Sequence, residues 1–409
     1  MNSPHDHRQI IPIKAVNDAP TAPQRNAYTL AQPTSRDDLA RVGRGTPMGE
    51  LLRRYWHPVG LAADAGNVPR VVTVLGEELI LFRSGQGEAG LLYPRCSHRG
   101  TSLLYGKVED DGIRCCYHGW KFGTSGQCLD QPCEPDGGKM RHKVFQPGYP
   151  VQERYGVIWA YLGPPDKQPV LPTYEPFENL QPGEFIEADD TSIGGGGPVI
   201  IDCNWFQHYE NVVDPWHVLV LHGTFSGAQF TEVMLRAPTI SFDYTPLGVK
   251  VTSLRTLEDG ATFRRVTEVG IPTLRVVPNP QVGKFERVES IGFVLPMDDT
   301  HFRIYTVGRV RESGELTAFR SRQKGKRWAE LTVEEHREFP GDYEAQVGQG
   351  AITFHSEEHL ATSDKGIAML RRMMRQQMDI VASGGDPAGV SFDAANATIN
   401  FEAGNFREG

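Results

Sequence analysis

Apolar residues of this 409-residue chain form two blocks of short β-type runs, and segments with the spacing of helices lie outside them. From about Pro58 to Pro165, short β-rich runs are separated by glycine turns, and Val71–Leu75 and Leu79–Phe82 flank Gly76-Glu77-Glu78 as a hairpin would. Further strands are expected at Leu91–Pro94, Gly112–Cys115 and Tyr155–Leu162. Short strands with frequent turns are typical of a small sandwich or barrel, so the pattern predicts an all-β domain over residues 58–166.

A second block of alternating runs lies between residues 237 and 312 and predicts one large antiparallel sheet. Its expected strands are Lys250–Leu257, Thr262–Val269, Leu274–Val277, Val288–Leu295 and Phe302–Arg311. Helices are expected from Pro47, over Asp202–His222, and after Ser363-Asp364 with an end at Gly384-Gly385. The proline-rich residues 169–198 are expected to be a connection.

The N-terminal residues are expected to lack stable structure. Residues 1–40 contain five prolines among polar side chains and no sustained hydrophobic period, which predicts a disordered extension. The helix from Pro47 belongs to a segment, residues 41–57, that we expect to pack on the larger domain. That larger domain covers residues 167–409, so the sequence predicts an α+β protein with two domains.

Composition excludes several classes of function. With 42 Lys+Arg against 51 Asp+Glu, the net charge is −9, which does not favour binding to nucleic acid. No apolar run approaches the roughly 18 residues of a membrane span, and residues 1–16 lack the apolar core of a secretory signal. Six cysteines are too few for a disulfide scaffold, so we expect a cytoplasmic enzyme.

One set of metal-ligating residues lies in the predicted all-β domain. Cys96-Ser97-His98 and Cys115-Cys116-Tyr117-His118 each offer one sulfur and one nitrogen at the tip of a strand. Two thiolates and two imidazoles could bind zinc, but zinc fingers usually pair like with like. The mixed pairs favour a [2Fe–2S] cluster in which histidines replace two thiolates on one iron. Cys116, Cys128, Cys133 and Cys203 are interpreted as reduced structural cysteines.

A second set follows Asn204. Glu210, Asp214 and His217 are spaced to share one stripe of a helix. His217 and His222, about 140° apart on an ideal helix, can reach one metal only if the helix ends or bulges between them. Two histidines and one carboxylate would form the facial triad of non-haem Fe(II) oxygenases. Asp214 stands three residues before His217, so its carboxylate could accept an imidazole N–H bond and orient that ring.

Both segments resemble one protein family. Cys96-Ser-His-Arg-Gly100 and Cys115-Cys-Tyr-His-Gly-Trp120 are similar to the cluster boxes of Rieske proteins, and residues 210–222 are similar to the E-N-x2-D-x2-H-x4-H segment of Rieske non-haem iron oxygenase α subunits. The resemblance implies that Cys96 and Cys115 bind one iron and His98 and His118 the other. It also implies that His217 and His222 bind a mononuclear iron. Asp214 would then link that iron to His118 of a neighbouring subunit.

The third ligand of the mononuclear iron lies far from the two histidines in the sequence. Residues 341–350 resemble the carboxylate box of phthalate-type oxygenases, which points to Asp342 as the ligand. Glu357, Glu358 and Asp364 are the alternatives, and they are better explained as a charged helix start and its cap.

The resemblance implies a fold and a function. The fold is a Rieske β-domain joined to a helix-grip catalytic domain with a large antiparallel sheet. The function is that of a terminal oxygenase, and because the chain has no G-x-G-x-x-G fingerprint, a separate reductase must supply its electrons. The resemblance implies that this partner is a flavin and [2Fe–2S] ferredoxin-type reductase, which relays electrons from NAD(P)H. Gly45–Val59 resembles the phthalate dioxygenase branch, whose members act on aromatic carboxylates with O2 as trimers or stacked trimers.

Within that branch the sequence favours a dioxygenase of a phenoxybenzoate- or phthalate-like acid, with diaryl-ether cleavage as one outcome. An O-demethylase of methoxylated or biaryl acids is the alternative, and a Rieske electron carrier and a zinc-stabilised module are more remote ones. A substrate carboxylate needs an arginine or several polar donors in its pocket. Arginines 255, 264, 265, 275, 287, 303 and 309 lie in the predicted sheet, and a solvated outer face is expected for each.

Overall fold

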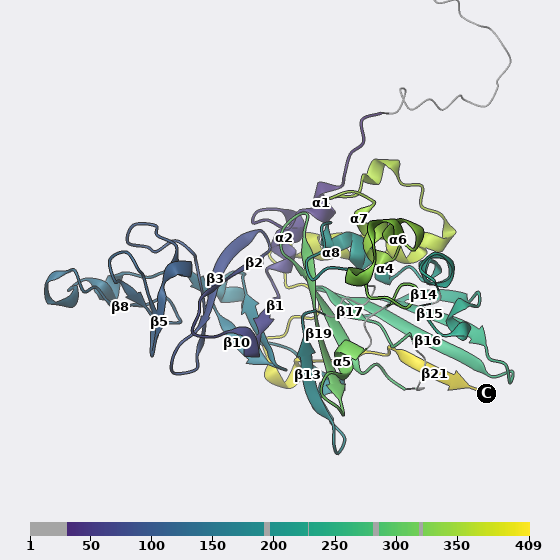
Figure 1. The fold of residues 1–409 in the computed structure, drawn as a ribbon. Helices are drawn as coiled ribbons and strands as arrows, with labels where there is room; N and C mark the ends of the chain where they lie inside the picture. The colour runs from purple at the N-terminus through teal and green to yellow at the C-terminus, as the bar shows by residue number, and fades with distance from the viewer. Residues whose placement is uncertain (1–30, 192–196, 228, 281–285, 319–321) are drawn as a thin grey trace, which may run out of the picture.

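The computed structural model of the protein describes residues 31–191, 197–227, 229–280, 286–318 and 322–409. A narrow lobe of short strands projects from a broad lobe in which helices cover a large sheet (Figure 1). The α+β class expected from the sequence is therefore confirmed. No helix in the described ranges is long and apolar enough to cross a membrane.

The last residues of the predicted N-terminal extension are folded. Residues 1–30 of the predicted extension lie outside the described ranges, but helix α1 (Asp37–Ala40) is formed. Just before it, the Thr34 N–H donates to Ser356 Oγ at 2.8 Å and the Arg36 N–H donates to His355 Nδ1 at 3.0 Å. These bonds to a distant turn order a segment that has no hydrophobic period of its own.

The narrow lobe contains three antiparallel sheets, ordered β1-β11-β10, β2-β3-β4-β9 and β5-β6-β7-β8. Their strands are β1 Trp56–Leu61, β2 Arg70–Val74, β3 Glu77–Arg83, β4 Ala89–Leu92, β5 Lys107–Glu109, β6 Gly112–Arg114, β7 Lys121–Phe122, β8 Cys128–Asp130, β9 Gly148–Tyr149, β10 Val151–Arg154 and β11 Val157–Tyr161. All of the strands expected in this domain are present.

The predicted hairpin is confirmed as β2 and β3, with a shorter turn than expected. Leu75 and Gly76 form the turn with φ of 49° and 78°, as two-residue hairpin turns require. Their backbone N–H groups donate to the carbonyls of Pro296 (2.9 Å) and Met297 (2.7 Å) in the broad lobe. The hairpin therefore connects the two lobes.

The broad lobe is built on a sheet with the strand order β13-β19-β18-β17-β16-β15-β14, and β21 pairs with β16. The strands are β13 Phe185–Asp189, β14 Thr239–Tyr244, β15 Gly248–Thr256, β16 Thr262–Gly270, β17 Leu274–Val276, β18 Ser290–Pro296, β19 Phe302–Val310 and β21 Gly404–Glu408, while β12 (Thr173–Tyr174) pairs with β20 (Thr398–Ile399). The five predicted strands are confirmed as β15 to β19. The expected connection 169–198 in fact contains β13, an edge strand that pairs only with β19 and lacks clean alternation.

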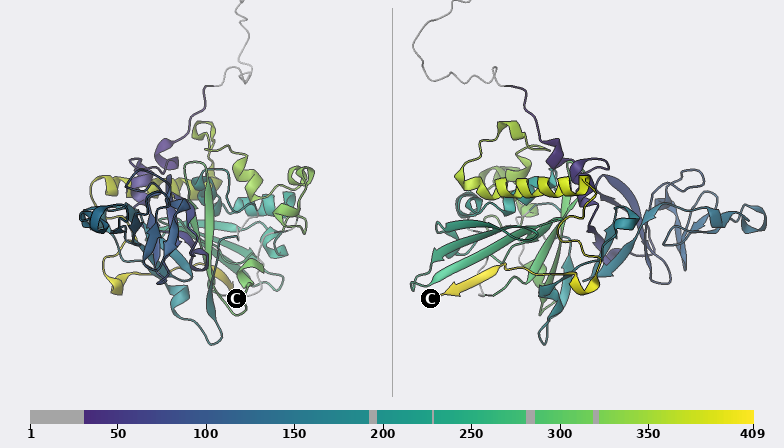
Figure 2. Two further views of the ribbon diagram at one scale, coloured as in Figure 1. Left: turned by 60° about the vertical axis from the view of Figure 1, so that its left-hand side comes forward. Right: turned by 180° about the vertical axis from the view of Figure 1, so that it is seen from behind.

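Helices cover the broad lobe. They are α1, α2 Pro47–Leu52, α3 Glu175–Glu178, α4 Trp205–Val212, α5 Glu315–Ala318, α6 Val333–Glu338, α7 Asp342–Val347 and α8 Lys365–Ala382, with a π-helix at Val218–Phe225. Short 3₁₀ turns occupy 62–64, 103–105, 135–137, 141–143, 165–167, 232–235, 328–330, 355–357, 362–364 and 394–396. The predicted helices from Pro47 and after Asp364 are confirmed, and α8 lies across the large sheet (Figure 2).

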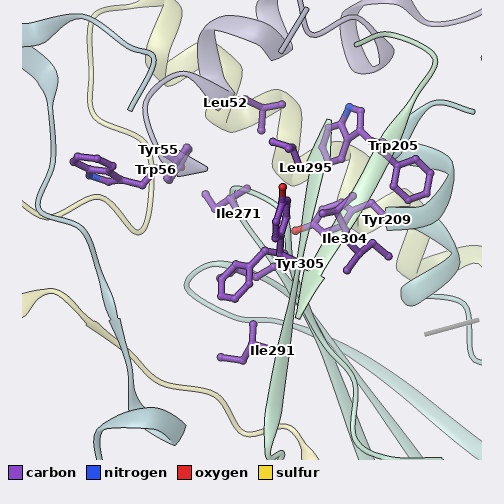
Figure 3. Close-up of a cluster of buried hydrophobic side chains, with 14 of the residues drawn as sticks. Leu52, Tyr55, Trp56, Trp205, Tyr209, Ile271, Ile291, Leu295, Ile304 and Tyr305 are labelled. Atoms are coloured by element: carbon purple, nitrogen blue, oxygen red, sulfur yellow. The ribbon is translucent and has the colours of Figure 1, made fainter. Parts of the chain in front are cut away.

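The described residues form two hydrophobic cores. The larger core combines α2, β1 and β11 with α4, α8 and the large sheet, and Figure 3 shows Leu52 and Trp56 in the same cluster as Tyr209 and Tyr305. The smaller core contains Ile80, Phe82, Leu92, Leu103, Ile113, Phe122, Cys96, Cys115 and Cys128. The far end of the narrow lobe thus has a core of its own.

Candidate metal centres

The segment Cys96–His98 lies in a tightly closed loop after β4. The Cys96 N–H donates to the carbonyl of Thr101 (2.9 Å), and the Gly100 N–H donates back to the carbonyl of Cys96 (2.8 Å). Gly100 has a φ of 78°, a left-handed conformation that favours glycine. The buried side chain of Gln146 accepts from the backbone N–H of Ser97 at 2.7 Å. It also donates to the carbonyls of Tyr93 and Arg95, which fixes the base of the loop.

The segment Cys115–His118 repeats this geometry between β6 and β7. The Cys115 N–H donates to the carbonyl of Trp120 (2.8 Å), and the Gly119 N–H donates to the carbonyl of Cys115 (3.1 Å). Gly119 has a φ of 72°, close to that of the matching glycine. The two loops therefore present one thiol and one imidazole each from equivalent turns.

The four predicted cluster ligands divide into an inner and an outer pair. The Cys96 and Cys115 side chains are buried, and burial raises the pKa of Cys96 to about 11, with a further rise from Cys115. His98 and His118 are only partly buried, with ring centroids 4.6 Å apart. The Nδ1 atom of His118 is buried and has no hydrogen-bond partner among the residues that the structure describes, so it is available to a metal. Two thiols and two imidazoles on facing loops fit the donor set of a [2Fe–2S] cluster.

The competing cysteine has a different environment. Cys116, which follows Cys115 directly, is exposed, as is Cys133. Cys128 and Cys203 are buried and free. Of the two adjacent cysteines, Cys115 therefore presents the buried thiol, and it interacts with Cys96.

The helix predicted over Asp202–His222 is wrong as a continuous helix. Helix α4 ends at Val212, a turn follows, and residues 218–225 form a π-helix. The Ser226 N–H donates to the carbonyl of Leu221 at 2.8 Å, the i to i−5 bond of this wider coil. The wider coil brings residues five apart together, and the rings of His217 and His222 have centroids 5.3 Å apart. The bulge that the histidine spacing requires is present.

Asp342, the first residue of helix α7, completes this group. One carboxylate oxygen lies 3.8 Å from His217 Nε2 and the other lies 3.3 Å from His222 Nε2. The three ligand atoms all lie within 4.8 Å of one another, and both His222 and Asp342 are buried. The structure thus brings together the two histidines and the carboxylate that the sequence analysis selected.

Each member of this triad is oriented by a further residue. Gln229 Oε1 lies 2.5 Å from His222 Nδ1, and the backbone carbonyl of Asp214 lies 2.5 Å from His217 Nδ1. Asn211 Nδ2 donates to Asp342 at 3.2 Å. Because Gln229 Oε1 and the Asp214 carbonyl can only accept, each histidine carries its proton on Nδ1, and both Nε2 atoms face the metal position. Sequence reasoning missed Gln229, and it quoted Asn211 without assigning a role.

In the structure the Asp214 carboxylate does not hold the His217 ring directly. One of its oxygens accepts from the Trp216 N–H at 2.8 Å, and the other stays 3.8 Å from His217 Nδ1. The turn after α4 directs the backbone carbonyl, rather than the side chain, toward the ring. The carboxylate of Asp214 therefore remains partly exposed beside the triad.

The expected stripe of Glu210, Asp214 and His217 is also broken by this turn. Glu210 is buried and accepts from Arg371 Nε at 2.5 Å and Nη2 at 2.9 Å. Arg371 also donates to Glu358, and the Ala361 N–H donates to Asp364. Two of the three alternative ligands, Glu358 and Asp364, thus have structural partners elsewhere.

The triad groups influence one another's protonation. Burial acts to raise the pKa of Asp342, but the charge and hydrogen bond of His222, followed by the charge of His217, hold it well below its ordinary range. Burial lowers the pKa of His217. Burial also opposes the charged form of His222, yet Asp342 raises its pKa. A carboxylate kept ionised between two imidazoles is a suitable donor set for a divalent metal such as iron.

The triad forms part of the wall of a cavity of about 420 Å³, within the range of small-molecule sites. Apolar side chains such as Phe230 and Met234 line it together with polar groups of the large sheet. Arg255 and Arg265 also line it and are only 4% and 7% exposed, so the expectation of a solvated outer face is wrong for them. Successive side chains of a strand point to opposite faces of the sheet. Arg264, one residue before Arg265, therefore lies on the other face, where it contacts Glu408.

Comparison with known proteins agrees with this geometry. The family described as "Rieske [2Fe-2S] domain" matches residues 55–150. Phenoxybenzoate dioxygenase subunit alpha of Ectopseudomonas oleovorans is 49% identical over 376 residues, with 90% of each chain covered. The 5,5'-dehydrodivanillate O-demethylase oxygenase subunit of a Sphingobium species is 33% identical, with 88% of this chain and 83% of that protein covered.

A solved structure shows that the fold is shared more widely. The NdmA protein of Pseudomonas putida CBB5 with caffeine matches 83% of this chain and 94% of its own, with a TM-score of 0.61 at 20% identity. The resemblance found in the two sequence segments is confirmed by relatives that match nearly the whole chain. This protein therefore belongs to the Rieske aromatic oxygenase α subunits, the terminal oxygenase components of multicomponent oxidoreductase systems.

Proposed function

We propose that this oxygenase holds its mononuclear iron with His217, His222 and Asp342, and its [2Fe–2S] cluster with Cys96, His98, Cys115 and His118. The observation that carries the proposal is the convergence of the three triad ligand atoms within 4.8 Å on the wall of a cavity. In such a pair, the cluster supplies electrons one at a time and the mononuclear iron supplies O2 activation.

The chain's own groups prepare this site. Gln229 and the Asp214 carbonyl hold the imidazole rings, and Asn211 holds the carboxylate. Burial of His222 and Asp342 keeps bulk water away from the reacting centre. These contacts support a site that binds metal on one side and an organic substrate on the other.

The proposed electron route crosses between subunits of a homotrimer or stacked trimers. The imidazoles of His98 and His118 are partly exposed at the end of the narrow lobe, while the Asp214 carboxylate is partly exposed beside the triad. A hydrogen bond from His118 of one subunit to Asp214 of the next would connect the centres. A flavin and ferredoxin-type reductase, acting in the cytoplasm, would deliver electrons from NAD(P)H.

For the substrate, we propose an aromatic carboxylate of the phenoxybenzoate type, attacked by ring dioxygenation. The 49% identity to a phenoxybenzoate dioxygenase subunit over 90% of both chains supports this choice. O-demethylation of a biaryl acid is the second candidate, because an O-demethylase subunit is 33% identical over 88% of this chain.

The test is turnover of purified, iron-loaded protein with NADH, a ferredoxin-type reductase and ¹⁸O₂. The acids are 3-phenoxybenzoate, phthalate and a methoxylated biaryl acid. Two labelled oxygens in the product would establish dioxygenation, whereas formaldehyde release would establish O-demethylation. Failure to oxygenate any aromatic acid, with both metal centres loaded, would refute the proposed function.

A further inference from the structure

Three arginines occupy neighbouring strands on the cavity face of the large sheet: Arg255 on β15, Arg265 on β16 and Arg275 on β17. We call these three residues the arginine wall. Arg265 is the direct cross-strand partner of Ser253 on β15, and Arg275 is the direct cross-strand partner of Val269 on β16. Nothing in the electron route or in the proposed metal ligation uses them, and an oxygenase of a neutral substrate would not need them.

Both Nη atoms of Arg265 are hydrogen-bonded to other parts of the protein. Its guanidinium donates to the carbonyl oxygens of Pro278 (2.5 Å) and Asn279 (3.2 Å), and to Asn405 Oδ1 (2.9 Å). Burial, together with the charges of Arg255 and Arg275, lowers its pKa to about 9. Arg265 therefore braces the cavity rim and β21, and it adds positive charge without a carboxylate partner among the described residues.

Arg255 is only partly engaged. Its Nε donates to the carbonyl of Arg236 (2.9 Å) and its Nη1 to Ser253 Oγ (3.1 Å), while Nη2 makes no hydrogen bond within the described ranges. Burial lowers its pKa to about 10. One edge of this guanidinium is fixed, and the other is left for a molecule in the cavity.

The guanidinium of Arg275 has no hydrogen bond or ion pair to any described residue, and its Nε is buried without a partner. Its charge acts on Asp342, which connects it to the triad. Burial lowers its pKa. A half-buried guanidinium without a hydrogen-bond partner is costly, because desolvation of the charge is not repaid.

Among the described residues, no carboxylate forms an ion pair with any of these three arginines. Glu315 lines the same cavity, but its carboxylate accepts from the backbone N–H of Arg311. Glu286 and Glu289 also line the cavity and have interactions of their own. An anionic substrate would supply the missing partner, and a planar carboxylate matches the fork of a guanidinium.

We infer that Arg275 and Arg255 bind the anionic substituent of the substrate, and that Arg265 positions the surrounding wall rather than the ligand. The inference rests on the proposed function, since it names the groups that recognise the acid at the same site. These contacts would make the protein selective for the acid over its neutral ester, because the ester carries no negative charge to compensate the arginine wall.

The experiment measures equilibrium binding by calorimetry, under anaerobic conditions, to protein that carries both metal centres. The probes are 3-phenoxybenzoate and its methyl ester, and the variants are Arg275→Gln, Arg255→Gln and the conservative Arg275→Lys. Arg264→Gln is the matched control, because it removes an arginine from the outer face of the same sheet. The cluster spectrum and the iron content verify that each variant is folded.

We expect the parent and Arg264→Gln to prefer the acid, and Arg275→Gln and Arg255→Gln to bind it about 10- to 100-fold more weakly, as loss of a charged hydrogen bond predicts. Ester binding should not change, and Arg275→Lys should recover part of the preference. Equal acid-to-ester ratios in the parent and both glutamine variants would overturn the assignment, while turnover of the acid would leave the oxygenase function standing. An arginine-dependent preference in a protein that oxygenates no aromatic acid would support the assignment and refute the proposed function.

Discussion

The two candidate metal centres are built in opposite ways. The cluster residues come from two equivalent backbone loops between Cys96 and His118, each closed by its own hydrogen bonds. The triad takes His222 from the π-helix, His217 from the residue just before that helix, and its carboxylate from α7, more than a hundred residues further along the chain. Local loops can hold one centre, whereas the other exists only once the broad lobe is folded.

The centres also differ in exposure. In the narrow lobe the thiols are buried and the imidazoles are partly exposed, so the histidines are accessible from outside. In the broad lobe the triad lies in the wall of the cavity, and His222 and Asp342 are buried. Electron exchange needs contact with a partner, and oxygenation needs protection from water, so each environment suits its proposed task.

Because the two hydrophobic cores are separate, damage to one centre should leave the other intact. Asp342→Ala should lose the mononuclear iron and lower turnover by more than about 100-fold, beyond the 10–100-fold typical of residues next to ligands. The visible spectrum of the cluster should not change. The converse variant, His118→Ala, should alter the reduced-state EPR signal and keep the triad iron. Full activity in Asp342→Ala would transfer the ligand role to another carboxylate.

Asp214→Asn tests the proposed connection between the centres. Asparagine keeps an acceptor for the Trp216 N–H and leaves the backbone carbonyl at His217 in place, so iron content should stay near that of the parent. Oxidation of the pre-reduced cluster with substrate and O2 present should slow by about 100-fold, because the charged acceptor is lost. Parental single-turnover kinetics would show that Asp214 is an ordinary turn residue.

Gln229→Leu tests how the buried centre holds its ligands. Removal of the acceptor at His222 Nδ1 frees the ring to adopt the other tautomer, and iron affinity should fall by about tenfold or somewhat more. Competition with a chelator gives this value. Gln229→Glu preserves an acceptor at the same position and should retain iron, and an equal loss in both variants would contradict the role of Gln229.

Cys116→Ala should have the smallest effect. The Cys116 side chain is exposed and lies outside the core that contains Cys96 and Cys115. The cluster spectrum and the turnover rate should therefore match those of the parent. Loss of colour in this variant would mean that Cys116, rather than Cys115, is a ligand.

The same contrast decides what the sequence can reveal. The hairpin, the five central strands and both Cys-His segments follow from short-range patterns, and the structure agrees with them. Asn211 and Gln229 act through contacts that form only in the folded chain, and no local pattern identifies Gln229. The arginine wall escaped prediction because a buried cation in a strand has the same alternation as an exposed one, and only the cavity makes the difference.

The shared core of α2, β1, β11 and the large sheet has a mechanical consequence. The narrow lobe leaves the broad lobe through β1 and returns through β11, and Leu61 and Val157 are direct cross-strand partners at the point of departure. The cluster-bearing end is therefore an insertion mounted on two adjacent, hydrogen-bonded strands rather than on a flexible tether. Such a mount resists bending and sets the reach of the cluster. It also offers a natural junction for grafting the cluster unit of one oxygenase onto the catalytic body of another.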